Sequence, residues 1–118
     1  MAMQRILLSG STSGKPIKVV QTATAGTLIH TATSDATEMD AVYLWAANTS
    51  GSAATLTMEW GGATDPADLL TKSYSIGANS APTVIANGQP LTGGMVVRAF
   101  SGTANVLTIT GYANRITR

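Results

Sequence analysis

The chain has 118 residues and a formal net charge of +1, with one histidine and no cysteine. Its length is sufficient for one domain with its own core. Without cysteine it can form neither a disulfide nor a thiolate metal site. The seven basic residues are scattered along the sequence, which predicts neither a nucleic-acid interface nor a surface for anionic membranes. Only 11% of the residues are charged, against roughly 25% in an ordinary soluble domain, and this composition favours a subunit that is covered by neighbours in an assembly.

A short apolar patch at residues 3–8 opens the chain, followed by a Ser/Gly-rich link at residues 9–14. The patch can form either an edge strand or an extended arm that reaches a neighbouring subunit. We divide the chain into an N-terminal arm and link, residues 1–14, and a β-domain, residues 15–118. In the arm interpretation, the residues expected to contact a neighbour are Arg5, Ile6, Leu7, Leu8 and Lys15.

Two short strands are expected next, at Lys15–Gln21 and Thr27–Thr31. Pro16 lacks an N–H and belongs at a strand start or a sheet edge. The following loop, residues 34–40, holds half of the acidic residues of the chain, Asp35, Glu38 and Asp40. Three carboxylates could ligate calcium, but no regular ligand spacing is present, so we expect a solvated turn and no metal.

The middle of the chain contains its two most apolar runs, Ala41–Ala47 and Ala53–Trp60, joined by the polar link Asn48–Ser52. The second run alternates between apolar and polar residues, which is typical of a half-buried strand. The first run is apolar on both faces, as in a strand that is covered on both sides. We predict that the two runs form a central hairpin and that both tryptophans, Trp45 and Trp60, fill the core.

The rest of the chain predicts further short strands and Gly-rich turns. Asn87-Gly88 is the strongest tight-turn dipeptide of the sequence. The expected strands are Lys72–Ile76, Thr83–Ala86, Met95–Phe100 and Val106–Tyr112, with a possible final edge at 113–118. Eight or nine strands at this spacing predict an all-β fold, a single antiparallel β-sandwich with an extended N-terminal arm. The strand order stays open between a jelly-roll-like and an immunoglobulin-like arrangement.

Catalytic residues are hard to find in this sequence. His30 is the only imidazole, and a Ser–His–Asp triad would require it to meet both a serine and an aspartate; a structural histidine is the simpler interpretation. Glu59 is the one acid inside a confidently predicted strand, and no second carboxylate can be named for paired-acid hydrolysis. We therefore expect a protein that is not an enzyme and that needs no cofactor. The longest apolar run, Ala41–Ala47, is far shorter than the roughly 20 residues of a membrane span.

Three segments carry a resemblance to a known class of proteins. The opening LSGSTSGKPIKV with TAGTLIHTA, the middle VYLWAANTSGSAATLTMEWGG and the closing GGMVVRAF with ANVLTITGYANRIT resemble small virion structural proteins of tailed bacteriophages. The resemblance covers nearly the whole chain and implies a capsid decoration, or cementing, protein. It implies a location on the capsid surface after synthesis in the bacterial host cytoplasm, with the major capsid protein and further copies of the chain, as a homotrimer, as partners.

A second class of function stays open. A head-fibre or tail-associated module would contact glycans of the host surface, with sugar rings stacked on exposed aromatic side chains. The aromatic residues that could form such a platform are Tyr43, Trp45, Trp60, Tyr74 and Tyr112.

Overall fold

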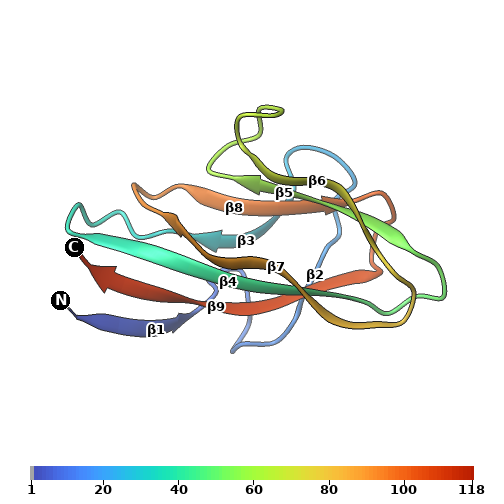
Figure 1. Cartoon of the computed structure of the whole chain (residues 1–118), viewed down its shortest axis with the longest axis horizontal. Helices are drawn as coiled ribbons and strands as arrows, with labels where there is room; N and C mark the ends of the chain where they lie inside the picture. The colour runs from blue at the N-terminus through green and yellow to red at the C-terminus, as the bar shows by residue number, and fades with distance from the viewer. Residues whose placement is uncertain (1) are drawn as a thin grey trace.

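The computed structural model describes residues 2–118, which form nine β-strands and, within that range, no helix (Figure 1). The strands are β1 (Met3–Leu7), β2 (Ile17–Lys18), β3 (Thr27–Thr31), β4 (Glu38–Asn48), β5 (Ala54–Trp60), β6 (Leu69–Ile76), β7 (Ser80–Leu91), β8 (Val96–Ser101) and β9 (Leu107–Thr117). None of the described segments is therefore a helix with the length and apolarity to span a membrane.

The strands form two packed antiparallel sheets. Sheet A has the order β1-β9-β4-β7, with β2 also paired to β9, and sheet B has the order β3-β8-β5-β6. Successive strands alternate between the sheets, except that β1 and β2 share one edge of β9 and β5 and β6 form a hairpin. The predicted antiparallel β-sandwich is confirmed, and this strand order is that of a jelly roll, not of an immunoglobulin domain.

The core lies between the sheets and is supplied by alternate residues of each strand. On β4 the inward side chains are Val42, Leu44 and Ala46, and on β5 they are Leu56 and Met58; all five are fully buried. Val97, Leu107 and Ile109 complete the centre of the same cluster. The alternation predicted for residues 53–60 is therefore the alternation between the core and the outer face of sheet B.

The predicted central hairpin is wrong, because β4 and β5 belong to different sheets. Their link is a crossover that the side chain of Asn48 holds in place. Its Nδ2 donates to the carbonyl oxygens of Ser52 at 2.8 Å and Ile76 at 3.1 Å, and its Oδ1 accepts from the backbone N–H of Ser50 at 2.9 Å. A polar five-residue link allows a hairpin or a crossover equally well, so its composition did not decide between them.

The Asn87-Gly88 pair does not form the predicted tight turn but lies inside β7. The register of β7 against β4 shifts by one residue there, so that Asn87 opposes Tyr43 and Gln89 opposes Val42. Gly88 is the extra residue of this β-bulge and has a φ of 87°, a conformation that glycine adopts without strain.

The N-terminal patch is an edge strand and not a free arm. β1 pairs with β9 without a break from Met3 opposite Ile116 to Leu7 opposite Tyr112, and Leu8 belongs to the core. Residues 3–8 are thus part of the sandwich, which corrects their assignment to a separate segment of residues 1–14. Met1 lies outside the described residues.

Candidate interaction surface

The outer face of sheet A carries apolar and aromatic side chains where a solvated sheet face usually carries polar ones. Directly opposed residues of paired strands share a face, so the registers of β1, β9, β4 and β7 identify this set. We call the large apolar and aromatic members of this set, together with Arg5, the aromatic face: Met3, Arg5, Leu7, Met39, Tyr43, Trp45, Val84, Tyr112 and Ile116. The polar residues Thr108, Thr110 and Asn114 of β9 lie on the same side of the sheet. Met3, Leu7 and Val84 are 65%, 59% and 53% exposed, and Arg5 is the one charged member.

A row of side chains crosses the aromatic face perpendicular to the strands. The guanidinium carbon of Arg5 lies 4.1 Å from the ring centroid of Tyr112, a cation–π contact. The rings of Tyr112 and Tyr43 are stacked, with centroids 5.1 Å apart, and Trp45 lies 6.0 Å from Tyr112. On β7, a Cβ on Gly88 would lie within 3.3 Å of the Tyr43 ring. The row therefore links β1, β9 and β4 through side chains, and on β7 the backbone of Gly88 lies against its end.

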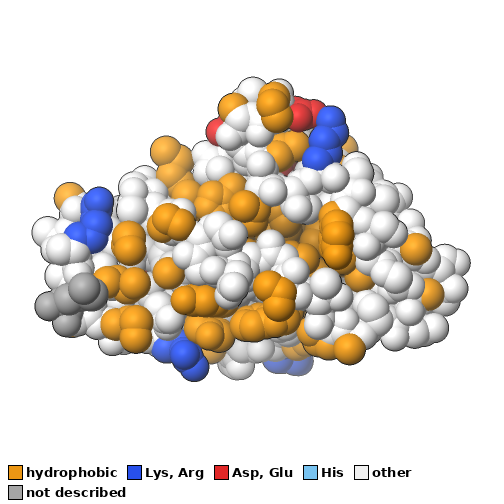
Figure 2. All heavy atoms as spheres, viewed as in Figure 1, with side chains coloured by type: hydrophobic (Ala, Val, Ile, Leu, Met, Phe, Trp, Pro, Cys, Tyr) orange, Lys and Arg blue, Asp and Glu red, His pale blue; other side chains and the backbone are white. Residues whose placement is uncertain are grey.

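The charge distribution leaves this part of the surface nearly neutral. Figure 2, a view in which strands of both sheets are in sight, shows hydrophobic side chains spread across this side of the molecule, with charged ones at the margins. On sheet A, Lys18 of β2 extends from the same outer face as the aromatic row but lies opposite Thr108, near the far end of β9. Exposed apolar side chains that lie together on a surface are typical of interaction sites.

The structure separates the five residues that the sequence proposed as contacts. Arg5 and Leu7 lie together on the aromatic face. Ile6 is partly buried against the core and Leu8 is 2% exposed within it, because side chains alternate along a strand. Lys15 is exposed in the loop between β1 and β2.

Trp45 does not fill the core, contrary to prediction, and lies half-buried on the aromatic face. Trp60 does pack against the core, from the end of β5, and its indole N–H donates to the carbonyl oxygen of Pro90 at 3.3 Å. Sequence reasoning took both tryptophans as core because both lie on very apolar strands. The usable signal was the alternation in β4, where Val42 and Leu44 already supply one complete apolar face and leave Tyr43 and Trp45 for the other.

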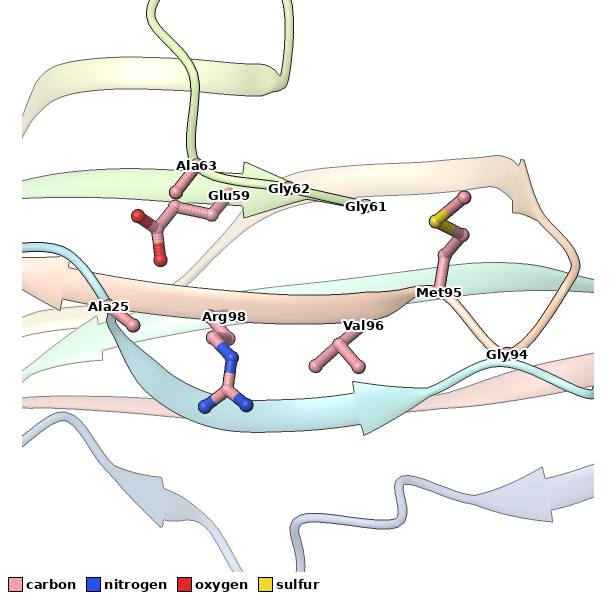
Figure 3. A pocket seen from close by; sticks show the side chains of 9 residues that line it. All are labelled: Ala25, Glu59, Gly61, Gly62, Ala63, Gly94, Met95, Val96 and Arg98. Carbon is pink, nitrogen blue, oxygen red and sulfur yellow. The ribbon is translucent and has the colours of Figure 1, made fainter.

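The outer face of sheet B is covered by loops, which leave a cavity of about 290 Å³ (Figure 3). Figure 3 shows Glu59 of β5 beside Arg98 of β8, with Ala25 on the covering loop. The buried carboxylate of Glu59 accepts from Thr24 Oγ1 at 2.7 Å and from the backbone N–H of Gly26 at 2.8 Å. Arg98 donates to the carbonyl oxygen of Gly26 at 3.3 Å. Each carboxylate oxygen of Glu59 accepts a hydrogen bond from the covering loop, so this side chain holds the loop on the sheet.

His30 lies in a buried polar cluster that joins the two sheets. Its Nδ1 accepts from the backbone N–H of Ser9 at 3.1 Å, so that nitrogen carries no proton, and its Nε2 donates to Asp40 Oδ2 at 2.8 Å. Arg115 binds the same carboxylate through two hydrogen bonds, at 2.8 and 2.9 Å. Serine, histidine and aspartate do meet, but both imidazole nitrogens are occupied and no serine hydroxyl of residues 2–118 is hydrogen-bonded to the ring, so the arrangement is not that of a catalytic triad.

The charges of this cluster set the ionisation of Asp40. Burial favours the neutral acid, but the hydrogen bonds from Arg115 and His30 and the charge of Arg115 outweigh it and hold the pKa of the Asp40 carboxyl below its usual value. The same hydrogen bond to Asp40 is the main cause that raises the pKa of Arg115. Asp40 is therefore an ionised, fully paired group between the sheets.

The three acids of the predicted solvated turn separate in the structure. Asp35 caps the turn, accepting at Oδ1 from the backbone N–H and the hydroxyl of Thr37 at 2.8 and 2.7 Å, and these bonds lower the pKa of Asp35. Glu38 accepts from Thr33 Oγ1 at 3.0 Å, and Asp40 enters the buried cluster. Residues 2–118 contain no group of three histidine or acidic side chains that could hold a metal ion.

Comparisons of the chain with protein-family models, with curated proteins and with solved structures gave no match.

Proposed function

We propose that this protein is a structural subunit of a tailed-phage virion, a decoration protein that binds the outer surface of the head at junctions between capsomers and stabilises the shell without catalysis. Its partners in this proposal are the major capsid protein and other copies of the chain, as a trimer. The resemblance of three sequence segments to small phage virion proteins motivates the assignment.

The aromatic face of sheet A is the observation that carries the proposal. Tyr, Trp and Arg are the residues that most often dominate the energy of protein interfaces, and Arg5, Tyr43, Trp45 and Tyr112 lie together there. The flanking residues Met3 and Leu7 are exposed and apolar, so their removal from water on docking would stabilise a complex.

Shell stabilisation follows from binding by mass action. A subunit that binds only the closed shell adds its binding free energy to that state. Repeated at every equivalent junction, modest contacts sum to a large resistance against opening. The low charge of the chain suits such packing, because few ions lose their hydration at the contact.

The test compares two exposed positions on opposite sheets. Leu7→Glu places a charge on the aromatic face without disturbing the core, and Tyr74→Glu, at a residue of β6 that is 48% exposed, is the matched control. Retention on purified phage heads should fall about tenfold or more for Leu7→Glu, since a buried unpaired charge costs more than 1.4 kcal/mol, and stay unchanged for Tyr74→Glu. A chain that is absent from particles, or far below the capsid protein in abundance, contradicts the proposal.

Glycan binding is the second candidate, and the outer position of Trp45 favours it. A sugar ring stacks on an open aromatic face, but Tyr112 is covered by Arg5 on one side and stacks on Tyr43 on the other. Trp45 would therefore carry the stacking. Glycan-array binding that is lost in Trp45→Ala would support this function over decoration.

A further inference from the structure

Of the edge strands, β7, β3 and β6 are protected against pairing with another chain. β7 carries Pro82 and Pro90 and three register shifts. β3 already binds the loop after β1, because Gly10 N–H donates to the Ile29 carbonyl oxygen and Thr31 N–H donates to Ser9 Oγ. β6 has register shifts against β5. Proline, bulges and covering loops are the devices by which natural sheets block their edges.

The β1 edge of sheet A has none of these devices. Its five residues pair with β9 in an unbroken register and include no proline or glycine. Thr117 N–H donates to the Ala2 carbonyl oxygen at 2.9 Å. Since only every second residue of an antiparallel strand bonds to a given neighbour, Ala2, Gln4 and Ile6 are the residues whose backbone groups bond to β9. The backbone N–H and C=O groups of Met3, Arg5 and Leu7 consequently point away from β9, toward the open edge.

We infer that β1 accepts an extended strand from a partner protein, which adds to sheet A as its next strand. The side chains of Met3, Arg5 and Leu7 lie on the aromatic face beside this edge, and the two apolar ones are largely exposed. The added strand would therefore carry apolar side chains opposite Met3 and Leu7. Main-chain hydrogen bonds give such complexes their affinity, and the alternate side chains give specificity.

Charge complementarity defines the central residue of the partner strand. Arg5 contacts the ring of Tyr112, and no carboxylate of residues 2–118 forms an ion pair with it. A partner strand with an acidic residue opposite Arg5 would supply the missing counter-charge. A second copy of β1 does not fit, because its sequence MQRIL contains no acid in any register and symmetric pairing at Arg5 would oppose two like charges.

This inference rests on the proposed function only for the source of the strand, which would be a protein of the virion shell. The pairing itself is a property of β1. The probe is therefore a synthetic peptide, Thr-Val-Thr-Glu-Thr-Val-Thr, which alternates as the edge requires and places its glutamate opposite Arg5. Its matched control, Thr-Val-Thr-Lys-Thr-Val-Thr, differs only in the central charge.

Amide hydrogen exchange of the full chain gives the direct measurement. Without peptide, the amides of Met3, Arg5 and Leu7 should exchange fast and those of Gln4 and Ile6 slowly. The glutamate peptide should protect the first three and bind about fivefold more tightly than the lysine peptide, a usual size for a cross-strand charge pair. Unchanged exchange of Met3, Arg5 and Leu7 at high peptide concentration overturns the inference.

Two substitutions at Arg5 separate the backbone from the side chain. Arg5→Pro removes an outward N–H without removing a hydrogen bond to β9, and should weaken the peptide about tenfold. Arg5→Ala keeps that N–H and should bind both peptides alike. Wild-type binding by Arg5→Pro would overturn the inference. If the peptide binds but the chain is missing from phage particles, the proposed function is wrong and the edge pairing stands. If the chain is present in particles but the peptide does not bind, the edge pairing alone is wrong.

Discussion

The two outer faces of the sandwich are covered in different ways. The outer face of sheet A is covered by its own side chains, in the row that runs from Arg5 through Tyr112 and Tyr43 to Gly88. The outer face of sheet B is covered by the backbone of the loop of residues 21–26. Hydrogen bonds from this loop to Glu59 hold it in place. In Figure 1 a second loop, residues 61–68, projects from this side. The outer face of sheet A therefore presents aromatic and apolar side chains to solvent, whereas the outer face of sheet B lies largely under backbone.

The strongest way to break this arrangement is to remove the group that joins the two sheets. Asp40→Ala leaves Arg115 and His30 without their shared partner, and we expect a loss of about 4 kcal/mol in the free energy of unfolding, as for other broken buried ion pairs. Urea denaturation of both proteins at neutral pH gives the measurement. A loss below about 1 kcal/mol would show that the cluster does not hold the sheets together.

The same substitution should alter the dependence of stability on pH. The pKa of Asp40 is lower in the folded protein than in the unfolded chain, so its stabilising contribution is complete above the ordinary aspartate pKa of about 3.9 and is lost as the pH falls through the folded value. Below about pH 4, the stability of Asp40→Ala should therefore fall less steeply with decreasing pH than that of the wild-type protein. Urea denaturation of both proteins over a series of pH values gives the measurement.

The next effect concerns the loop cover of sheet B. Glu59→Ala leaves the N–H of Gly26 and the hydroxyl of Thr24 without an acceptor, and we expect a destabilisation of about 3 kcal/mol. Glu59→Gln retains an acceptor for Gly26 and a hydrogen-bonding group for Thr24, and should cost about 1 kcal/mol. Hydrogen exchange at Gly26 should rise in the alanine variant and leave the amides of β9 protected. Equal stabilities for the two variants would contradict the role of Glu59 in holding the loop.

A smaller effect is expected from the aromatic cover of sheet A. Tyr112→Ala removes the ring that contacts Arg5, Tyr43 and Trp45 together, and should cost about 2 kcal/mol, because the site is only partly buried. Tyr74→Ala is the control on sheet B and should change stability by less than about 0.5 kcal/mol. Equal losses at both positions would show that the row contributes nothing beyond the exposed area of one tyrosine.

The smallest effect is expected at the loop that projects from sheet B. Asp65 and Lys72 form an ion pair there with side chains 48% and 62% exposed, and pairs of this kind contribute about 0.5 kcal/mol or less. Lys72→Ala should leave the melting temperature nearly unchanged. A large shift would contradict the expectation that this exposed pair contributes little to stability.

The class of fold could be predicted from the sequence, because alternation and Gly-rich links are local signals. The expected runs 95–100 and 106–112 lie almost wholly within β8 and β9, although β9 also takes up the predicted separate edge at 113–118. Pairing between strands was not predictable, since the link Asn48–Ser52 contains no information about which sheet the next strand joins. The same limit hid the aromatic face: Tyr112 and Tyr43 meet only because β9 lies next to β4, and their separation in sequence offers no hint of it.

The position of β1 has a consequence for biosynthesis. Within residues 2–118 its partner strand is β9 alone, and the ribosome makes β9 after the other strands described there. β1 must therefore wait unpaired until translation has passed residue 116. A prematurely terminated chain lacks β9, and with it the ladder that keeps β1 extended. A chain that stops before β9 therefore cannot present β1 as a paired edge strand.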